Sequence, residues 1–326
     1  MPQPFVLPDS VTPARRRLAS VPVCLEQCIE DRLQRIVPSS EIHPQPLHRA
    51  MRHAVFSGGK RIRPQLLLQI AGACGADLRE FDLALSVGCA VELIHTASLV
   101  HDDLPCFDDA ATRRGQPTVH VLFGIPMAVL AGDALLTLAF ESLADVPPLL
   151  ADRALRVVRL LGRATGSAAG LIGGQSMEQS FDAGAMSVTP ELIERYQDMK
   201  TAALFQLACE AGAVVAGSVH AADWAVVGQL LGRWYQLADD CLDVQGLPEL
   251  AGKPIGQDAA HGRPNAMAYL GANAMLAKLR GLLCEIKSRI VELCAAADTS
   301  PTSILHFVES VSAQIMRAMG ADHASK

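Results

Sequence analysis

The chain has 326 residues, of which 50% are apolar and only 4% aromatic, and its formal net charge is −6. This apolar fraction excludes a disordered chain and predicts a large aliphatic core. There are 28 Lys and Arg against 34 Asp and Glu, so nucleic-acid binding is not expected. The most apolar window, 121–140, is interrupted by Pro126, Gly132 and Asp133, and no transmembrane segment is predicted.

Nine cysteines, an odd number, are scattered along the chain and never occur as C-x-x-C. This usage is typical of reduced thiols and predicts a cytoplasmic location. No apolar stretch long enough for a signal peptide follows the three arginines at 15–17. We expect a flexible N-terminal arm over 1–20, and a single domain over 21–326 because no convincing linker divides this part.

Helical spacing of apolar residues dominates from residue 45 to the end. In chain order, the stretches that carry it are 83–97, 127–143, 153–161, 191–215 and 227–242. Loops are expected around Pro147-Pro148 and over 181–190 and 246–264, where Pro and Gly interrupt the pattern. Because no run alternates with period two for long enough to form a strand, the sequence predicts an all-α fold.

Two short segments are unusually acidic: DDLPCFDD at 102–109 and DDCLD at 239–243. On a helix, the three Asp of the second segment share one face with Gln236. In the first, Pro105 ends the helix, so Asp108 can turn back towards Asp102. Oxygen ligands without clustered His or Cys favour a hard cation, and Mg²⁺ fits best. Either segment alone could equally hold solvated surface acids or helix N-caps.

Basic residues accompany these acids. Lys60, Arg61 and Arg63 follow two glycines, Arg113 and Arg114 follow the first acidic segment, and Lys253 follows the second. Fixed cationic donors beside metal-binding carboxylates are what a diphosphate needs, because both then share its charge. Each basic residue taken singly is more typical of a solvated surface. There is no P-loop and no G-x-S-x-G motif, which disfavours nucleotide chemistry and a serine hydrolase.

The motifs resemble those of the trans-prenyltransferases, the short-chain polyprenyl diphosphate synthases, and look most like bacterial geranylgeranyl diphosphate synthases. They run over nearly the whole chain as GGKRIRP (58–64), HDDLPCFDDAATRRG (101–115), GGQSMEQ (173–179), KTAALF (200–205), QLADDCLDV (236–244) and GKPIGQD (252–258). The resemblance implies an isoprenoid-synthase-type helical bundle around a central hydrophobic cavity, and a homodimer. It also implies Mg²⁺-dependent condensation of isopentenyl diphosphate with an allylic diphosphate (dimethylallyl, geranyl or farnesyl), giving mainly geranylgeranyl diphosphate.

The same resemblance implies roles for individual residues. Three Mg²⁺ ions are expected when substrate is bound, held by Asp102, Asp103, Asp108, Asp239, Asp240 and Asp243. The allylic diphosphate is expected at Arg113, Lys200 and Lys253, and isopentenyl diphosphate at Lys60, Arg63, His95 and Arg114. Thr201 and Gln236 match positions near the reacting carbons, where oxygen dipoles stabilise an allylic cation. The proton is expected to leave with the departing diphosphate.

The chain departs from the family pattern at a few positions. Ala110 and Ala111 stand where acids are common, while Gln257 and Arg263 each replace a common Lys, so the late phosphate contacts differ in detail. Ala97 and Ser98, which precede Asp102 by five and four residues, are the residues expected to set the length of the product chain.

Ala97 lies about 7.5 Å from Asp102 along the helix axis, at a position that is aromatic in farnesyl-forming relatives. A small residue there predicts a product longer than fifteen carbons, although Ala97 could also be a simple helix–helix contact. A farnesyl or longer-chain synthase, a class I terpene cyclase and a non-catalytic partner subunit are the alternatives.

Overall fold

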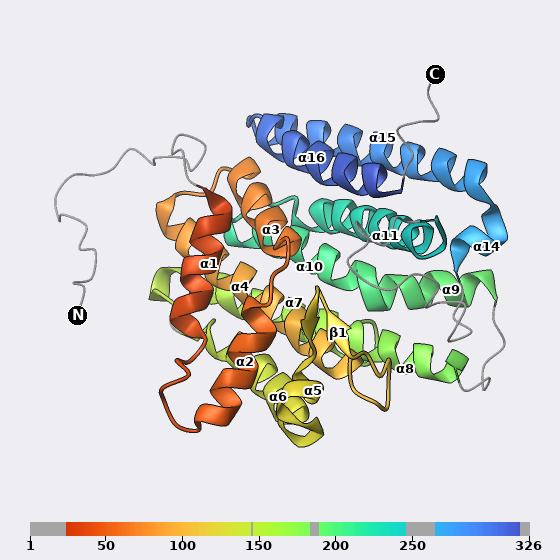
Figure 1. Cartoon of the computed structure of the whole chain (residues 1–326). Coiled ribbons are helices and arrows are strands. Elements are labelled where there is room, and N and C mark those ends of the chain that lie inside the picture. Colours follow the sequence, from red (N-terminus) through yellow and green to blue (C-terminus); the bar gives the residue numbers. More distant parts are fainter. Residues whose placement is uncertain (1–23, 145, 183–188, 246–264, 320–326) are drawn as a thin grey trace.

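Helix α4 (Leu78–Asp102) is a core helix of a helical bundle, and helices from the N-terminal half and the middle of the chain pack against it (Figure 1). The computed structural model describes residues 24–144, 146–182, 189–245 and 265–319. Besides α4, these residues form the helices α1 (Leu25–Ile36), α2 (Gln45–Phe56), α3 (Ile62–Ala73), α5 (Val119–Phe123), α6 (Ile125–Glu141), α7 (Ala151–Thr165), α8 (Leu171–Asp182), α9 (Pro190–Gln197), α10 (Ala203–Val215), α11 (Ala221–Gln245), α14 (Ala266–Leu270), α15 (Ala272–Ala296) and α16 (Thr302–Ala318). The predicted all-α fold is confirmed.

The sequence of α4 explains both its start and its burial. Asp77 caps its first turn and accepts hydrogen bonds from the backbone N–H groups of Arg79 and Glu80, while the Glu80 side chain accepts from the Asp77 N–H. The helix is apolar on nearly all sides, which is typical of a core helix. By length and composition α4 could cross a membrane, but 78% of its apolar window is buried inside the bundle.

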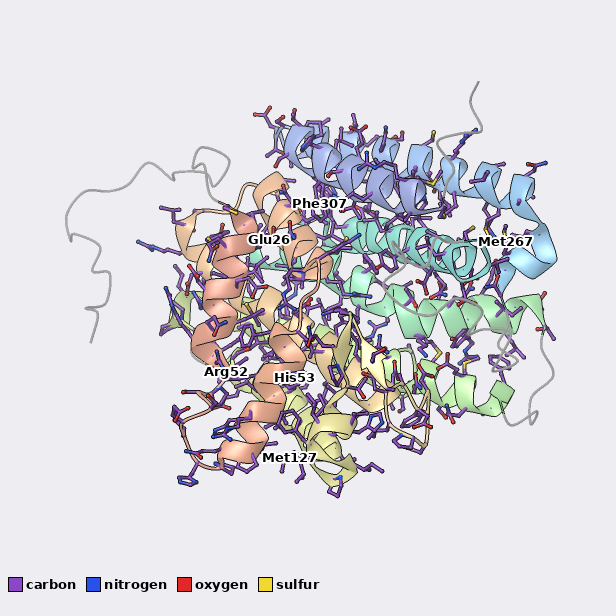
Figure 2. All side chains as sticks on the ribbon, viewed as in Figure 1. Glu26, Arg52, His53, Met127, Met267 and Phe307 are labelled. Carbon is purple, nitrogen blue, oxygen red and sulfur yellow. The ribbon has the colours of Figure 1, made fainter. Side chains whose placement is uncertain are left out.

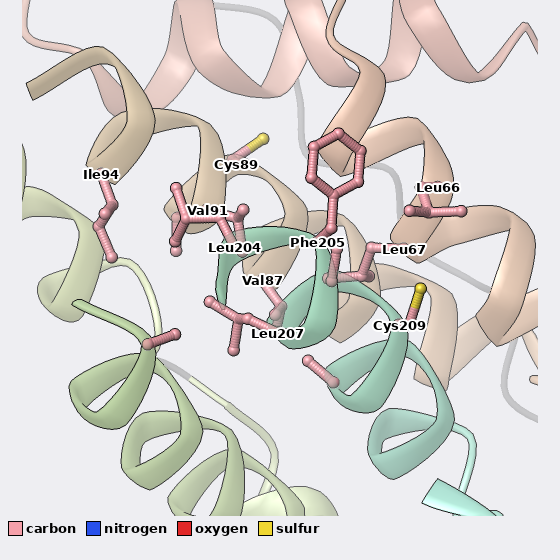
Figure 3. Packing of buried hydrophobic residues seen from close by; sticks show 14 of the residues in the cluster. Leu66, Leu67, Val87, Cys89, Val91, Ile94, Leu204, Phe205, Leu207 and Cys209 are labelled. Atoms are coloured by element: carbon pink, nitrogen blue, oxygen red, sulfur yellow. The ribbon is translucent and has the colours of Figure 1, made fainter. Parts of the chain in front are cut away.

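The core lies where α3, α4 and α10 meet (Figure 3). Leu67 of α3, Val91 of α4 and Leu204 of α10 are each no more than 1% exposed. Gly88 of α4 packs on Pro64 and Gly212 of α10 packs on the Leu67 carbonyl, so these glycines let the helices approach closely. This packing fixes the middle of α4 relative to α3 and α10.

The C-terminal helices α15 and α16 form a layer over α11 at the top of Figure 1. Phe307, labelled in Figure 2, belongs to α16 and lines an apolar crevice together with Trp234 of α11 and Phe205 of α10. Helix α11 thereby lies between this layer and α10, with its acidic C-terminal half extending towards α9 and α14.

One feature that the sequence did not predict is a pair of short strands in the described residues, β1 (Thr112–Arg113) and β2 (Gln116–Pro117), paired antiparallel. The connecting residues Arg114 and Gly115 have φ angles of 54° and 75°, as a tight hairpin with left-handed central residues requires. His53, on α2, donates from Nε2 to the Pro117 carbonyl at 2.8 Å and holds the hairpin against the bundle (Figure 2). Two-residue strands are too short to produce a period-two pattern.

A second difference concerns the helix expected over 191–215. The structure divides it into α9, a π turn (Asp198–Ala202) and α10. Within the predicted loops, residues 183–188 and 246–264 lie outside the described residues, as does the predicted arm at 1–20.

Candidate active site

The first acidic segment follows the C-terminal end of α4 and turns back on itself. The backbone N–H of Asp108 donates to the Asp102 carbonyl at 2.9 Å, and that of Ala110 donates to the Asp103 carbonyl at 3.2 Å. This turn is the one expected from Pro105, and it brings Asp108 close to Asp102.

Asp103 faces the β-hairpin rather than the other acids. Asp103 as a whole residue is 4% exposed. Its Oδ1 accepts hydrogen bonds from Arg113, from Nη2 at 2.7 Å and from Nε at 2.8 Å. Burial raises the pKa of Asp103, although Arg113 lowers it. The structure thus gives Asp103 a defined task, which is to orient Arg113 beside Asp102.

Asp102 occupies an environment that penalises its negative charge. Burial raises the pKa of Asp102 to about 6; Lys200 opposes this shift, while Glu178 and Asp108 add to it. Asp102 therefore lies within electrostatic range of Lys200, Glu178 and Asp108. A cation bound here would favour the ionised carboxylates, because it offsets both burial and mutual repulsion.

Sequence reasoning missed Glu178, on α8. Its side chain is 2% exposed and forms an ion pair with Lys200 Nζ, and Tyr196 Oη donates to Glu178 Oε1 at 2.6 Å. Gly174 of α8 lies directly against the Lys200 backbone, where a Cβ would clash. This close approach places Glu178 beneath Lys200. Glu178 lies within the motif GGQSMEQ (173–179), but the motif alone assigned it no role, because its importance comes from the contact between α8 and the π turn.

Thr201 and Gln236, both expected near the reacting carbons, contact each other in the structure. Thr201 Oγ1 donates to Gln236 Oε1, and Gln236 Nε2 donates to Asp240 Oδ1 at 2.7 Å. These three side chains form a chain from the π turn to α11. The Thr201 and Gln236 oxygens therefore lie next to Lys200 in space.

The three acids of the second segment differ in burial. Asp240 is 1% exposed, and its Oδ2 accepts from Gln197 Nε2 at 3.2 Å and from the Ala266 N–H at 2.9 Å. Asp240 consequently ties α11 to α9 and α14 through its Oδ2 atom, a role that the helical spacing could not indicate. Asp243 is also buried, whereas Asp239 is half-buried and on the more open side.

Four basic or imidazole groups gather where α3 and the hairpin approach α4. Arg63 lies with its guanidinium carbon 4.7 Å from the Phe205 ring centroid, and its buried Nε has no hydrogen-bond partner among the described residues. Arg114 donates to the Gly58 carbonyl, next to exposed Lys60. Burial lowers the pKa of His95, and Arg63 and Arg114 lower it further. A buried, unpaired donor beside this positive charge suits a phosphate oxygen.

Arg61 differs from its neighbours at 60 and 63. It is 3% exposed and turns inward, where Nη1 pairs with Glu92 at 2.9 Å and Nε pairs with Glu30 at 2.7 Å. The expectation that Arg61 joins Lys60 and Arg63 in approaching an anion is therefore wrong. Its backbone has a left-handed φ of 46°, and its side chain anchors the loop instead.

The carboxylates near the end of α4 suit a magnesium ion that also binds substrate phosphates. Within the described ranges, no three His, Cys, Asp or Glu side chains lie close enough to hold a metal ion by themselves. Mg²⁺ is commonly held by one or two carboxylates with water and substrate phosphates. The pair Asp102 and Asp108, beside Lys200 and Arg113, suits that arrangement.

Two predicted substrate-binding residues, Lys253 and Arg263, lie outside the described residues, together with the substitution Gln257. Ala97 is completely buried on α4, and Ser98 Oγ donates to the His95 carbonyl at 2.8 Å. Arg113 is within electrostatic range of both Asp102 and His95. The acidic group and the basic group are therefore near each other, and Arg113 lies within electrostatic range of both.

Known proteins resemble this chain over most of its length. The polyprenyl synthetase family model matches residues 44–290. A geranylgeranyl diphosphate synthase of Cereibacter sphaeroides is 43% identical over 240 residues, covering 74% of this chain and 80% of the relative. A farnesyl diphosphate synthase of Geobacillus stearothermophilus is 37% identical over 267 residues, covering 77% and 85%.

Solved structures give the same result. A geranyltransferase of Helicobacter pylori, complexed with magnesium and isoprenyl diphosphate, has a TM-score of 0.75 and is 25% identical. That match covers 88% of this chain and 97% of the other. Fold, motifs and relatives therefore agree, and the chain belongs to the polyprenyl synthetase family of prenyltransferases, as its motifs predicted.

Proposed function

We propose that the protein condenses isopentenyl diphosphate with an allylic diphosphate and makes mainly geranylgeranyl diphosphate. The observation that carries this proposal is the pair of adjoining groups: Asp102 with Lys200, and Arg63 with His95, linked electrostatically by Arg113. A condensation of two diphosphates needs two neighbouring anion sites. A terpene cyclase, which binds one diphosphate, has no use for the second group.

Each group of residues has its own part in the reaction. Lys200 and Arg113 hold the allylic diphosphate, and Lys253 and Arg263 are assigned to the same substrates by their motifs. Lys60, Arg63, His95 and Arg114 hold isopentenyl diphosphate. Three magnesium ions would be held, when substrate is bound, chiefly by Asp102, Asp108 and Asp239. Their positive charge would lower the energy barrier for departure of the diphosphate.

The carbon chemistry needs no side-chain base. The allylic carbon–oxygen bond breaks, the isopentenyl double bond attacks the allylic carbon, and a proton then leaves to the departed diphosphate. The oxygens of Thr201 and Gln236, fixed by their mutual hydrogen bond, stabilise the allylic cation between these steps.

Product length is assigned from Ala97. This side chain is completely buried on the stripe of α4 that runs away from Asp102, so neighbouring side chains must move as the hydrocarbon chain grows past it. The 43% identical relative is a geranylgeranyl diphosphate synthase, which supports twenty carbons. The farnesyl diphosphate synthase at 37% identity makes fifteen carbons the alternative.

A homodimer in the cytoplasm is also part of the proposal. Large apolar side chains are exposed along α5 and α6, among them Val121 (52%), Ile125 (49%) and Leu130 (52%). An apolar surface of this kind suits a second copy of the chain. Sedimentation equilibrium of the purified protein tests the dimer.

The decisive experiment incubates the purified protein with Mg²⁺, isopentenyl diphosphate and each allylic diphosphate in turn. We expect elongation to a twenty-carbon diphosphate, detected by chromatography after removal of the phosphates. Diphosphate release without consumption of isopentenyl diphosphate would favour a cyclase. No turnover at all would favour the non-catalytic subunit.

A further inference from the structure

An ion pair outside the groups described above joins the π turn to α11. Asp198, the first residue of the turn, accepts from Arg233 through both oxygens, with Nε at 2.7 Å from Oδ1 and Nη2 at 2.6 Å from Oδ2. Gln229, one helical turn before Arg233, donates from Nε2 to Asp198 Oδ2 at 3.1 Å. Pairing at two points fixes orientation as well as distance, because two guanidinium nitrogens donate to the two carboxylate oxygens.

The other end of the π turn is fixed to the same helix. Thr201 bonds to Gln236, which lies one helical turn after Arg233. A third contact involves the last residue of the turn: Gly232 lies directly against Ala202, and a Cβ at Gly232 would overlap the Ala202 backbone. The π turn is therefore held on α11 at its start and near its end, with a close backbone approach at its last residue.

A π turn needs such support because its hydrogen bonding is wider than that of an α-helix and it is rare in proteins. It inserts about one extra residue, so relaxation to α-helix would rotate the residues on one side by about 100° relative to the other. Either the Lys200 side chain would then no longer point towards Glu178, or the Thr201 side chain would no longer point towards Gln236. In the structure both contacts are present together with the π turn.

We propose that Asp198 and Arg233 are positioning residues that hold Lys200 and Thr201 in the geometry needed for ionisation of the allylic diphosphate. This inference rests on the proposed function. The side chains of Arg233 and Asp198 are 39% and 25% exposed, so the pair adds little to global stability. Its effect is local, and it acts on catalysis through Lys200 and Thr201.

Variants at both positions test this role. In Asp198→Asn and Arg233→Gln we expect kcat to fall about tenfold while KM for isopentenyl diphosphate, which Lys200 does not hold, changes less than about twofold, because the lost orientation matters in the transition state. The charge-reversed double variant Asp198→Arg/Arg233→Asp should recover kcat to within about threefold of the wild type. The matched control is Lys287→Gln, which removes a surface ion pair to Glu309 between α15 and α16 and should leave kcat unchanged.

Amide hydrogen exchange gives a readout that does not depend on turnover. Exchange in a peptide spanning 196–205 should accelerate in Asp198→Asn and return towards the wild-type rate in the charge-reversed variant. Wild-type kcat in the single variants, or equal loss in the double variant and the singles, would overturn the positioning role. A wild-type protein that forms no elongated product would instead overturn the proposed function, and the two failures are thus distinguishable.

Discussion

Lys200 and Glu178 form an ion pair whose partners differ in burial: the lysine side chain is 19% exposed and the glutamate side chain 2%. When one partner of a buried ion pair is removed, stability is lost mainly because the other charge stays buried without its counter-charge. We therefore expect Lys200→Met to lower the free energy of unfolding by about 3–5 kcal/mol. Glu178→Gln should cost clearly less, because the partly exposed ammonium can reach water.

Denaturant unfolding of these variants and of the double variant Lys200→Met/Glu178→Gln checks this order. The double variant should be more stable than Lys200→Met alone, since it no longer contains the buried carboxylate that has lost its Lys200 counter-charge. Equal stabilities of Lys200→Met and Glu178→Gln would contradict the argument from burial.

The two carboxylate partners of Arg61 also differ in burial. They are Glu92, with a side chain 3% exposed, and Glu30, with a side chain 33% exposed. Glu92→Gln should lower the free energy of unfolding by about 3–5 kcal/mol, because it leaves a buried guanidinium short of its buried counter-charge. Glu30→Gln should cost about 1 kcal/mol or less.

Urea denaturation measures both variants. The Asp82 pair to Arg32 offers a control, because the Asp82 side chain is 68% exposed and Asp82→Asn should behave like Glu30→Gln. A larger loss in Glu30→Gln than in Glu92→Gln would show that α1, and not the core, supplies the anchor for Arg61.

Much of this architecture follows from local patterns. The apolar spacing predicts the buried core of α4, and Pro105 predicts the turn that returns Asp108 to Asp102, because a ring at that position ends a helix. These features depend on residues close together in the sequence. They need no knowledge of what packs against them.

The features that sequence reasoning missed depend on distant partners. Arg61 looks like one more phosphate ligand until Glu92, 31 residues later, is placed beside it. Glu178 stands in the motif GGQSMEQ, but its pairing with Lys200 follows only from the contact of α8 with the π turn. The apolar spacing continues from α9 into α10, so it does not predict the π turn. Hence the sequence predicts helices and candidate ligands, whereas tertiary contacts decide which charged groups face substrate and which face each other.

The buried methyl group of Ala97 leads to a prediction about product length. Ala97→Phe should place an aromatic ring across the path of the growing chain, about 7.5 Å from Asp102, and shift the main product from twenty carbons to fifteen. Some loss of stability is expected, about 1–3 kcal/mol, because the position is already fully packed.

Product chromatography with geranyl and farnesyl diphosphate as starters separates the two effects. Ala84→Phe, a fully buried position nearer the other end of α4, should lose stability in the same way but keep the wild-type product. An unchanged product length in Ala97→Phe would remove Ala97 from the wall of the chain pocket.

His95 leads to a prediction about pH. Burial and the neighbouring Arg63 and Arg114 hold the pKa of His95 well below its ordinary value of 6.5. Between that lowered pKa and 6.5 the unfolded chain binds a proton that the folded protein does not. Stability therefore falls as the pH drops below 6.5, by up to about 1.4 kcal/mol per pH unit from this group.

The variant His95→Gln isolates this contribution, because its difference from the wild type cancels the titration of Asp102 and the other acids. Urea unfolding at pH 7.5 and pH 5.5 should show a smaller loss of stability in His95→Gln than in the wild type, while the exposed variant His306→Gln should match the wild type at both. Equal losses in all three proteins would mean that His95 is protonated in the folded state. A protonated imidazole among Arg63 and Arg114 would also raise the positive charge at this site in the absence of substrate, so the same measurement decides whether His95 acts there as a neutral hydrogen-bond donor.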